Sequence, residues 1–292
     1  MDQYAFLRTF GVRLETVDLL AVMETYRTGH AKGYCGEVTF NDADIEVTLQ
    51  AMCKGRACSV EETPLRNGAR FYHAMKALVE ANGFTSVAVK CWPELLAPGL
   101  EIAACLPLTW LQTIGVVRGA SCESDCPAAV MQSLATLLTG QPAACLDFVN
   151  YPGRCNCVEL GHCGVGIAGQ MAEESIAYKS PDRQGGEQHA PALIGQFRYG
   201  VKTGFTLAPT PDGRLKLLAF TGESSPETAQ GKRYSAADVL VRNYRELDRL
   251  ILCEGFPHHV TVAMTDITRE LEILCDYYGI AYFPANSGIS PA

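Results

Sequence analysis

The sequence feature that most constrains the fold is an interval without charged side chains between Asp125 and Asp147. A transmembrane helix needs about 20 apolar residues, and this interval is long enough to supply them. Helix signals divide it, however, because Ser124 or Asp125 can cap a first turn that contains Pro127, and Gly140 marks the end of that helix. Polar side chains within the interval would also be costly in lipid. We therefore predict a buried helix followed by a short buried strand, and no membrane span.

Two carboxylates lie at the margins of this strand–helix–strand unit. Glu123 follows one predicted strand, and Asp147 follows the next strand along the chain. Open parallel sheets bind ligands outside the carboxyl ends of their strands. The two side chains are therefore expected to meet over one ligand.

The first half of the chain, residues 1–150, has the pattern of a doubly wound α/β domain. Segments with helical periodicity alternate there with short segments rich in β-branched residues. A helix is expected at 63–83, with Gly83 at its C-terminal end. The expected strands are 10–18, 85–92, 115–122 and 143–148.

The second half, residues 151–292, has the pattern of a β-rich domain. Residues 191–223 alternate in hydrophobicity and contain a Pro-Asp-Gly turn, which predicts an antiparallel hairpin or a small barrel. Asp266 and Gly279 are expected to cap a late helix. The remaining expected elements are a helix at 235–256, a strand at 258–264, a helix at 266–279 and a strand at 280–284.

Composition excludes some classes of function. The net charge is −8 and basic residues are scattered, so the sequence offers no basic stripe for nucleic acid. The first fifteen residues carry charges and no apolar core, which argues against a secretory signal. The 13 cysteines are then expected to be reduced thiols in a cytoplasmic protein. Cys155, Cys157, Cys163 and His162 are an alternative zinc cluster, but they lack the paired spacing of structural zinc sites.

Three features have the chemistry of a metal site. Glu123, Asp147 and the dipeptide His258-His259 offer carboxylate and imidazole ligands. If they converge, they suit a divalent metal that keeps open positions for substrate oxygens, with the imidazole favouring Mn²⁺ over Mg²⁺. The alternative is purely structural: a helix cap, a loop carboxylate and a solvated strand edge.

A resemblance supports the metal site. The segments "FGVRLETVD", "VKCWPEL", "ASCESD", "CLDF", "LGHCG", "GFTLAP", "TGE" and "GFPHHVTVAMTDI" occur in the order and at about the spacing of motifs in the L-fucose/L-arabinose isomerase-like family. The resemblance covers nearly the whole chain. It implies that Glu123, Asp147 and His259 bind Mn²⁺, and that Glu123 and Asp147 also act as the acid/base groups of aldose–ketose interconversion.

The same resemblance suggests substrate contacts. His258 stands where fucose isomerases have Asn, which implies contact with the sugar more than with the metal. His162 in "LGHCG" matches an "FHCG" motif of the broader family, with a site role or a structural role both open. Trp92 in "KCWPEL" matches a motif near the pocket, although a buried Trp at a strand end is an equal alternative.

The function implied is a metal-dependent aldose–ketose isomerase that acts through an enediol on an open-chain sugar such as L-fucose or D-arabinose. One alternative is a non-catalytic sugar-binding or regulatory protein. Another is an isomerase of a modified sugar such as a sulfohexose, for which Arg154, Arg183 and Arg198 are the cationic candidates.

The resemblance also concerns assembly. Family members carry an additional N-terminal α/β domain that helps to form the substrate pocket, and the present sequence matches from their second domain onward. The site is therefore expected to be covered by a second copy of the chain, in a homo-oligomer with its interface beside Trp92 and the metal ligands, or by a partner that supplies the domain.

Overall fold

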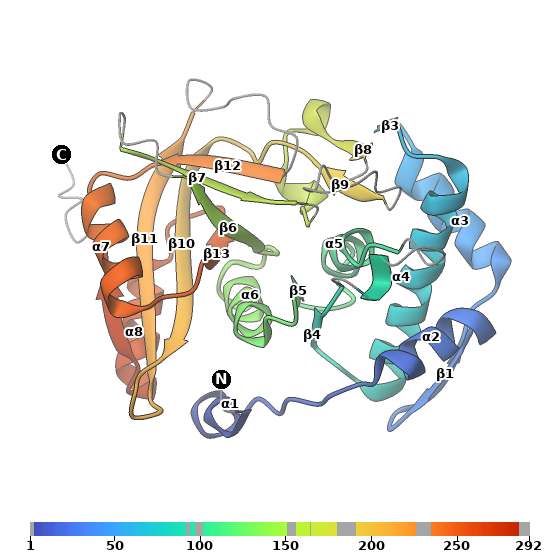
Figure 1. Ribbon diagram of the computed structural model, residues 1–292, viewed down its shortest axis with the longest axis horizontal. Helices are drawn as coiled ribbons and strands as arrows, with labels where there is room; N and C mark the ends of the chain where they lie inside the picture. The colour runs from blue at the N-terminus through green and yellow to red at the C-terminus, as the bar shows by residue number, and fades with distance from the viewer. Residues whose placement is uncertain are drawn as a thin grey trace.

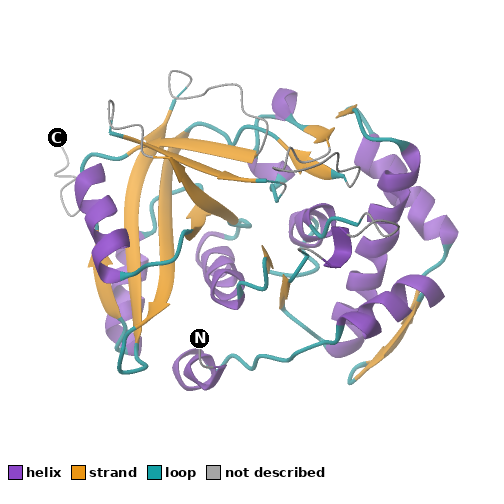
Figure 2. Cartoon of the chain, in the orientation of Figure 1, coloured by secondary structure: helices purple, strands orange, loops and turns teal. Residues whose placement is uncertain are grey.

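The computed structural model describes residues 3–91, 94–96, 102–150, 156–163, 165–179, 191–225 and 235–285. Helices and strands are mixed along these residues, which confirms the α/β class. Figure 2 shows a strand-rich side, formed by the large sheet with helices at its outer edge, and a helix-rich side opposite to it, with further helices between the two.

A curved sheet forms the strand-rich side (Figure 1). Its strands, in spatial order, are β10 (Gly200–Pro209), β13 (His259–Ala263), β6 (Ala144–Asn150), β7 (Cys157–His162), β12 (Ser235–Leu240), β11 (Leu215–Ser224) and β14 (Ala281–Pro284). Strands β10 and β11 also pair with each other as an antiparallel hairpin, from Gly200↔Ser224 to Pro209↔Leu215. The hairpin predicted within residues 191–223 is thus confirmed. Because this hairpin joins β10, at one edge of the order, to β11, which is itself paired with β12 through Glu223↔Leu240, the sheet closes into a small barrel.

Helices cover the barrel on the outside. One apolar cluster joins α6 (Cys126–Thr139), α8 (Thr268–Tyr278) and α1 (Gln3–Phe10) to the hairpin strands, with Met131, Leu271 and Phe205 among its buried members. Helix α7 (Tyr244–Glu254) packs against the main core through Leu247 and Leu250. None of the described helices combines the length and the apolar character that a membrane crossing requires.

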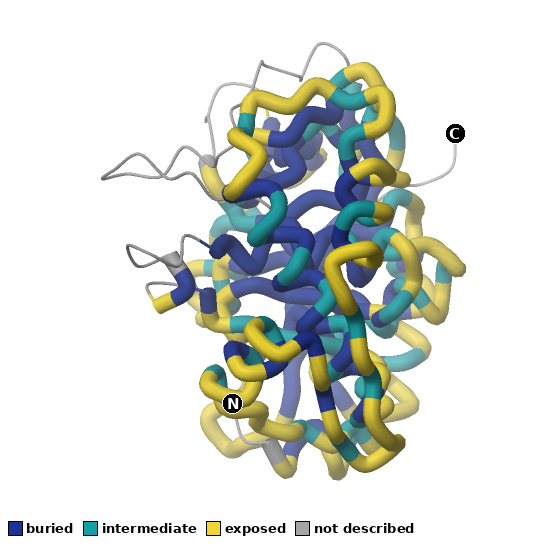
Figure 3. The backbone as a smooth tube through the Cα atoms, turned by 90° about the vertical axis from the view of Figure 1, so that its right-hand side faces the viewer, coloured by how far each residue is buried: buried dark blue, intermediate teal, exposed yellow. Residues whose placement is uncertain are grey.

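The helix-rich side is built around α4 (Glu62–Asn82), which matches the helix predicted at 63–83 and ends at Gly83 with the left-handed φ of 70°. The other elements on this side are α2 (Leu19–Thr28), the β1–β2 hairpin (His30–Gly33 and Gly36–Thr39), α3 (Asp42–Cys53), α5 (Cys105–Thr113) and the parallel pair β4 (Ser86–Val89) and β5 (Gly119–Cys122). A small sheet of β3 (Ala57–Cys58), β8 (Ala177–Lys179) and β9 (Ala192–Ile194) and three short 3₁₀ turns, Glu94–Leu96, Ala168–Gln170 and Glu173–Ser175, complete the described chain. Figure 3 shows the buried segments running through the middle and exposed segments around the margin.

Two predicted elements are wrong in type. The strand expected at 10–18 does not form: α1 ends at Phe10, and residues 11–18 are neither helix nor strand. Apolar and polar residues alternate in this segment because Val12 and Leu14 pack against the apolar cluster of α1, α6 and α8. The segment pairs with no described strand. The helix expected at 235–256 begins only at Tyr244, and its first part is the buried strand β12, which pairs along its whole length with β7.

Two further corrections concern the pairing of strand β6 and the N-terminal cap of helix α8. Strand β6 does not extend the parallel β4–β5 pair, since it pairs antiparallel with β13 and with β7. Asp147 consequently lies inside a strand, Ala144–Asn150, and not just past its end. Asp266 is not the N-cap of α8; Ile267 occupies that position, and Asp266 Oδ1 accepts hydrogen bonds from the backbone and hydroxyl of Thr268 at 3.0 and 2.7 Å.

Candidate metal centre

A strained turn between β5 and α6 places two carboxylates. Glu123 and Ser124 have φ values of 57° and 59°, a left-handed conformation that costs an L-residue roughly 1–2 kcal/mol. The turn is tied together by the backbone N–H of Asp125, which donates to Cys122 O at 3.1 Å, and by the hydroxyl of Ser121, which donates to Asp125 O at 2.6 Å. As a result, the side chains of Glu123 and Asp125 leave the same turn on the barrel side.

Close packing of β5 on α6 sets the position of this turn. A Cβ atom at Gly119 would lie 2.0 Å from the carbonyl oxygen of Ala129, so only glycine allows this approach. The N-terminus of α6 is held by Asp125, whose Oδ1 accepts from the backbone N–H of Ala128 at 2.9 Å. The cap expected at the start of the uncharged interval is thus confirmed, as is the C-cap at Gly140, with φ 68°.

Three adjacent strands of the barrel supply the opposite wall. His259 is the first residue of β13 and lies directly across from Asp147 on β6, and Asp147 in turn lies across from Gly161 on β7. His162 follows Gly161 at the end of β7. Side chains distant in sequence therefore meet because their strands are neighbours in the sheet.

Asp147, His162 and His259 form an inner group. One ligand atom from each lies within 4.8 Å of the other two. Asp147 Oδ1, His162 Nε2 and His259 Nε2 are all buried, and none makes a hydrogen bond of good geometry with the described residues, although Asp147 Oδ1 and His259 Nε2 lie 3.2 Å apart. Buried polar atoms without partners cost about 1–3 kcal/mol each, so a ligand or water that bonds to all three atoms would be stabilised here. A divalent metal fits this donor set, because one carboxylate and two imidazoles are the ligands that such ions take in proteins.

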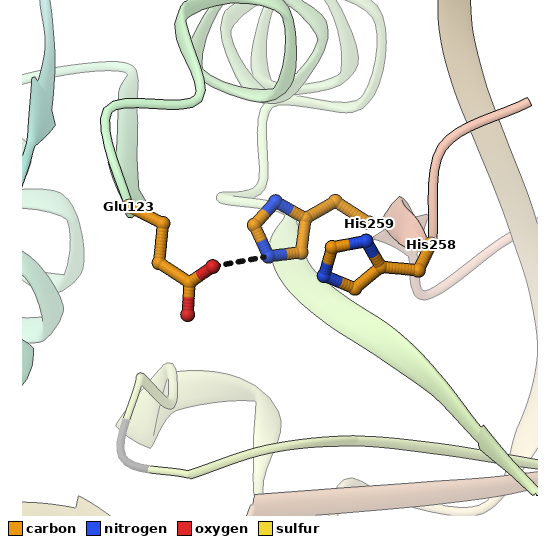
Figure 4. Close-up of side chains that lie close together, drawn as sticks. All are labelled: Glu123, His258 and His259. Carbon is orange, nitrogen blue, oxygen red and sulfur yellow. Dashed lines mark ion pairs between the residues drawn. The ribbon is translucent and has the colours of Figure 1, made fainter.

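Glu123, His258 and His259 form an outer group that shares His259 with the inner one (Figure 4). Glu123 Oε2 lies 3.6 Å from His259 Nε2, and Asp147 Oδ1 lies 3.2 Å from the same nitrogen. The His258 side chain is 67% exposed and its Nε2 is 3.9 Å from Asp147 Oδ1. Glu123 and His258 thus lie on the solvent-facing side of the site, which we call its mouth, and the inner group, including His259, lies at its base.

Charge around the site is unevenly distributed. Burial acts to lower the pKa of His259, but the contacts with Asp125 and Asp147 outweigh it and raise that pKa to about 10. Burial acts to raise the pKa of Asp147, yet the close approach of His259 and the charge of His162 lower it. The three carboxylates of Glu123, Asp125 and Asp147 thus lie around His259, and their negative charge favours a cation at this position.

The predicted residues differ in how the structure places them. Glu123, Asp147 and His259 come together as described, and His258 lies beside them. His162, which the sequence assigned to the substrate, has its Nε2 in the inner group and is therefore also placed to hold an ion. Trp92 lies outside the described residues.

Two other groups of the sequence analysis do not add to the site. Cys157 begins β7 and Cys163 follows its last residue, His162, so the two lie roughly 20 Å apart for an extended strand and do not share a zinc ion; Cys155 lies outside the described residues. Arg198 is exposed and donates its Nε to Met171 O at 3.3 Å. Arg154 and Arg183 lie outside the described residues.

Sequence reasoning missed the second role of Asp125. Its Oδ2 is 2.8 Å from His259 Nδ1, and its side chain is only 17% exposed. The sequence carried one signal for it, the pair of acidic residues in "CESD", but that signal was fully explained by the helix cap.

Comparison with known proteins gives two similar sequences, and no protein-family model matches the chain. The chain is 27% identical over 282 residues to the sulfoquinovose isomerase of Clostridium sp. (strain MSTE9), covering 92% of this chain and 58% of that protein. It is 24% identical over 267 residues to the sulfoquinovose isomerase of Alkalicoccus urumqiensis, covering 90% and 56%. The chain thus spans a little over half the length of the curated relatives it matches, and both relatives are named as sugar isomerases.

Proposed function

We propose that this chain forms the metal-holding part of an aldose–ketose isomerase whose substrate is an open-chain sugar. The observation that carries the proposal is the convergence of three buried, unpartnered ligand atoms from Asp147, His162 and His259. The similarity to two sulfoquinovose isomerases supports the reaction class and makes a 6-sulfonated hexose the first substrate to test. L-Fucose and D-arabinose, suggested by the family resemblance, are the second.

The proposed ligands are Asp147, His259 and Glu123, with His162 as a fourth. The mixed carboxylate and imidazole set favours Mn²⁺ over Mg²⁺. When bound, such a metal acts as a Lewis acid on the carbonyl and hydroxyl oxygens at C1 and C2 of the sugar.

The acid/base roles follow from exposure. The Glu123 side chain is 51% exposed and extends into the mouth of the site, whereas that of Asp147 is 29% exposed and lies in the strand β6. We therefore assign to Glu123 the transfer of a proton between C1 and C2, and to Asp147 the transfer between the two oxygens. His258, at the mouth, is placed to hydrogen-bond a sugar hydroxyl.

Assembly and location belong to the proposal as well. Glu123 and His258 are exposed in the isolated chain, and an isomerase must exclude water from its enediol. A second copy of the chain, or a partner chain, is therefore proposed to cover the mouth of the site in a cytoplasmic assembly. The division into domains at residue 150 remains part of this proposal.

The test is an isomerase assay on the full chain, first stripped of metal and then supplied with Mn²⁺. Sulfoquinovose, L-fucose and D-arabinose serve as substrates, and ketose formation and deuterium uptake from solvent, at C1 of the ketose and at C2 of the aldose, are followed by NMR. At saturating Mn²⁺, Glu123→Gln should lower kcat about 10²–10⁴-fold, which is the range for loss of a general acid or base. Glu246→Gln, an exposed ion-paired glutamate on α7, is the matched control and should be as active as wild type.

The outcomes of this assay distinguish between the proposed functions. Turnover of sulfoquinovose alone supports the sulfosugar reaction, and turnover of the other sugars alone supports the fucose-like reaction. Sugar binding with Mn²⁺ present, but with neither ketose nor deuterium uptake, would establish the non-catalytic alternative.

A further inference from the structure

Asp125 divides its two carboxylate oxygens between two elements. Oδ1 accepts the backbone N–H of Ala128 and so caps α6, while Oδ2 lies 2.8 Å from Nδ1 of His259, 134 residues further along the chain. A helix cap needs only one acceptor, and serine or asparagine provides it as well as aspartate. The second contact is therefore not explained by the cap.

The chemistry of that contact determines the state of the imidazole. An ionised carboxylate only accepts hydrogen bonds, so Nδ1 of His259 must be protonated and donate to Asp125 Oδ2. In the neutral ring, the lone pair then resides on Nε2, the atom that faces Asp147 and Glu123 at 3.2 and 3.6 Å. The ring is also held in orientation, because His259 is 5% exposed and its Nδ1 is bonded to Asp125.

We propose that Asp125 is a positioning residue that fixes the tautomer and orientation of His259 so that Nε2 is presented as a metal ligand. This inference rests on the proposed metal centre. Carboxylates that hydrogen-bond a ligating histidine contribute about 10–100-fold to metal affinity, and that is the effect expected here.

The strained turn is consistent with this role. The left-handed residues Glu123 and Ser124 bring the carboxylates of Glu123 and Asp125 to opposite sides of one imidazole. A turn that only started α6 would not require this conformation. The same three-residue segment thus supplies one group beside Nε2 and another at Nδ1.

The experiment separates the cap from the contact with three variants. Asp125→Asn and Asp125→Ser keep an N-cap acceptor for Ala128 but no longer offer His259 a carboxylate, and Asp125→Ala loses both. Mn²⁺ affinity is measured by electron paramagnetic resonance of the free ion, and the melting temperature is measured on the metal-free chain. Asn41→Ala removes the capping box of α3, which lies outside the proposed site, and is the control for the loss of a cap.

The variants should separate into two groups. Asp125→Asn and Asp125→Ser should melt close to wild type and yet bind Mn²⁺ about 10–100-fold more weakly. Asp125→Ala and Asn41→Ala should both melt about 2–4 °C lower, but only Asp125→Ala should lose affinity.

Two results would overturn the inference in different ways. Wild-type affinity in Asp125→Asn and Asp125→Ser would show that Asp125 is a helix cap alone and would leave the metal centre standing. Failure of the wild-type chain itself to bind Mn²⁺ would refute the metal centre and this inference together.

Discussion

Two buried basic side chains of the barrel are in opposite electrostatic environments. His259 begins β13, and Lys202 lies on β10 next to Thr203, which pairs with the last residue of β13, Ala263. The two side chains therefore lie toward opposite ends of one strand pair. They are 5% and 1% exposed, so both are removed from water.

Burial lowers the pKa of both side chains, and their partners decide the outcome. His259 faces carboxylates, which outweigh burial and raise its pKa to about 10. Lys202 donates to neutral oxygens, namely the carbonyls of Arg198 and Gly200 and the hydroxyl of Ser224, and its pKa is lowered to about 8. Opposite charges thus stabilise the protonated form of His259, whereas the neutral oxygens around Lys202 do not compensate for its burial.

The largest effect should come from removing the imidazole. His259→Gln removes the only residue common to the inner and outer groups, so Mn²⁺ affinity should fall by more than about 100-fold, beyond the range found for outer partners of a ligand. Calorimetric titration of the metal-free chain measures it. The matched control is His73→Gln, since His73 is half-buried and bonds to Thr48 at 2.7 Å on the helix-rich side. Equal affinity in the two variants would contradict the assignment of His259.

A smaller effect is expected from the lysine, and it depends on pH. The pKa of Lys202 falls from 10.5 to about 8 on folding, so the protonated form is disfavoured in the folded state. This penalty is fully present below about pH 8 and disappears as the pH rises toward the pKa of the unfolded chain. From about pH 7 to about pH 10, the free energy of unfolding of wild type should therefore rise relative to Lys202→Met by roughly 1–3 kcal/mol. Denaturant unfolding at each pH gives this difference in the free energy of unfolding. If the difference does not change with pH, the buried charge of Lys202 does not destabilise the folded state.

The smallest effect concerns the turn that brings carboxylates to His259. Ser124→Gly removes a Cβ from a residue with φ 59°, a relief of roughly 1–2 kcal/mol that is partly offset by the chain entropy of glycine. The chain should be stabilised by about 0.5 kcal/mol, with unchanged Mn²⁺ affinity. Ser124→Ala keeps the Cβ and should give no stabilisation in the same thermal unfolding assay. A loss of affinity in Ser124→Gly would mean that the strain itself holds the carboxylates in place.

Local features of the fold followed from the sequence alone. Gly83, Gly140 and Gly279 end their helices as predicted, and the alternating segment 191–223 contains a hairpin. These features depend on residues close in the chain, since a cap or a turn is stabilised by hydrogen bonds over a few positions. The order of motifs likewise pointed to Glu123, Asp147 and His259 before any geometry was known.

Only the tertiary structure shows which strands, distant in sequence, pair with one another. The strand β6 had the apolar character of a buried strand, but its neighbours are β13 and β7 and not the parallel pair β4–β5. Residues 10–18 alternated like a strand and found no strand to pair with. Hydrophobic periodicity indicates which face of a segment is buried, but it does not indicate which other segment covers that face.

The candidate site shows the same division. The sequence identified residue types suited to a metal, because carboxylates and histidines can be recognised one at a time. Only the register of three strands placed His162 Nε2 beside Asp147 and His259, and only the left-handed turn at Glu123 and Ser124 carried Asp125 to the far nitrogen of His259. Tautomer and ligand geometry depend on distances of a few ångströms between atoms that are far apart along the chain, and those distances are set by packing.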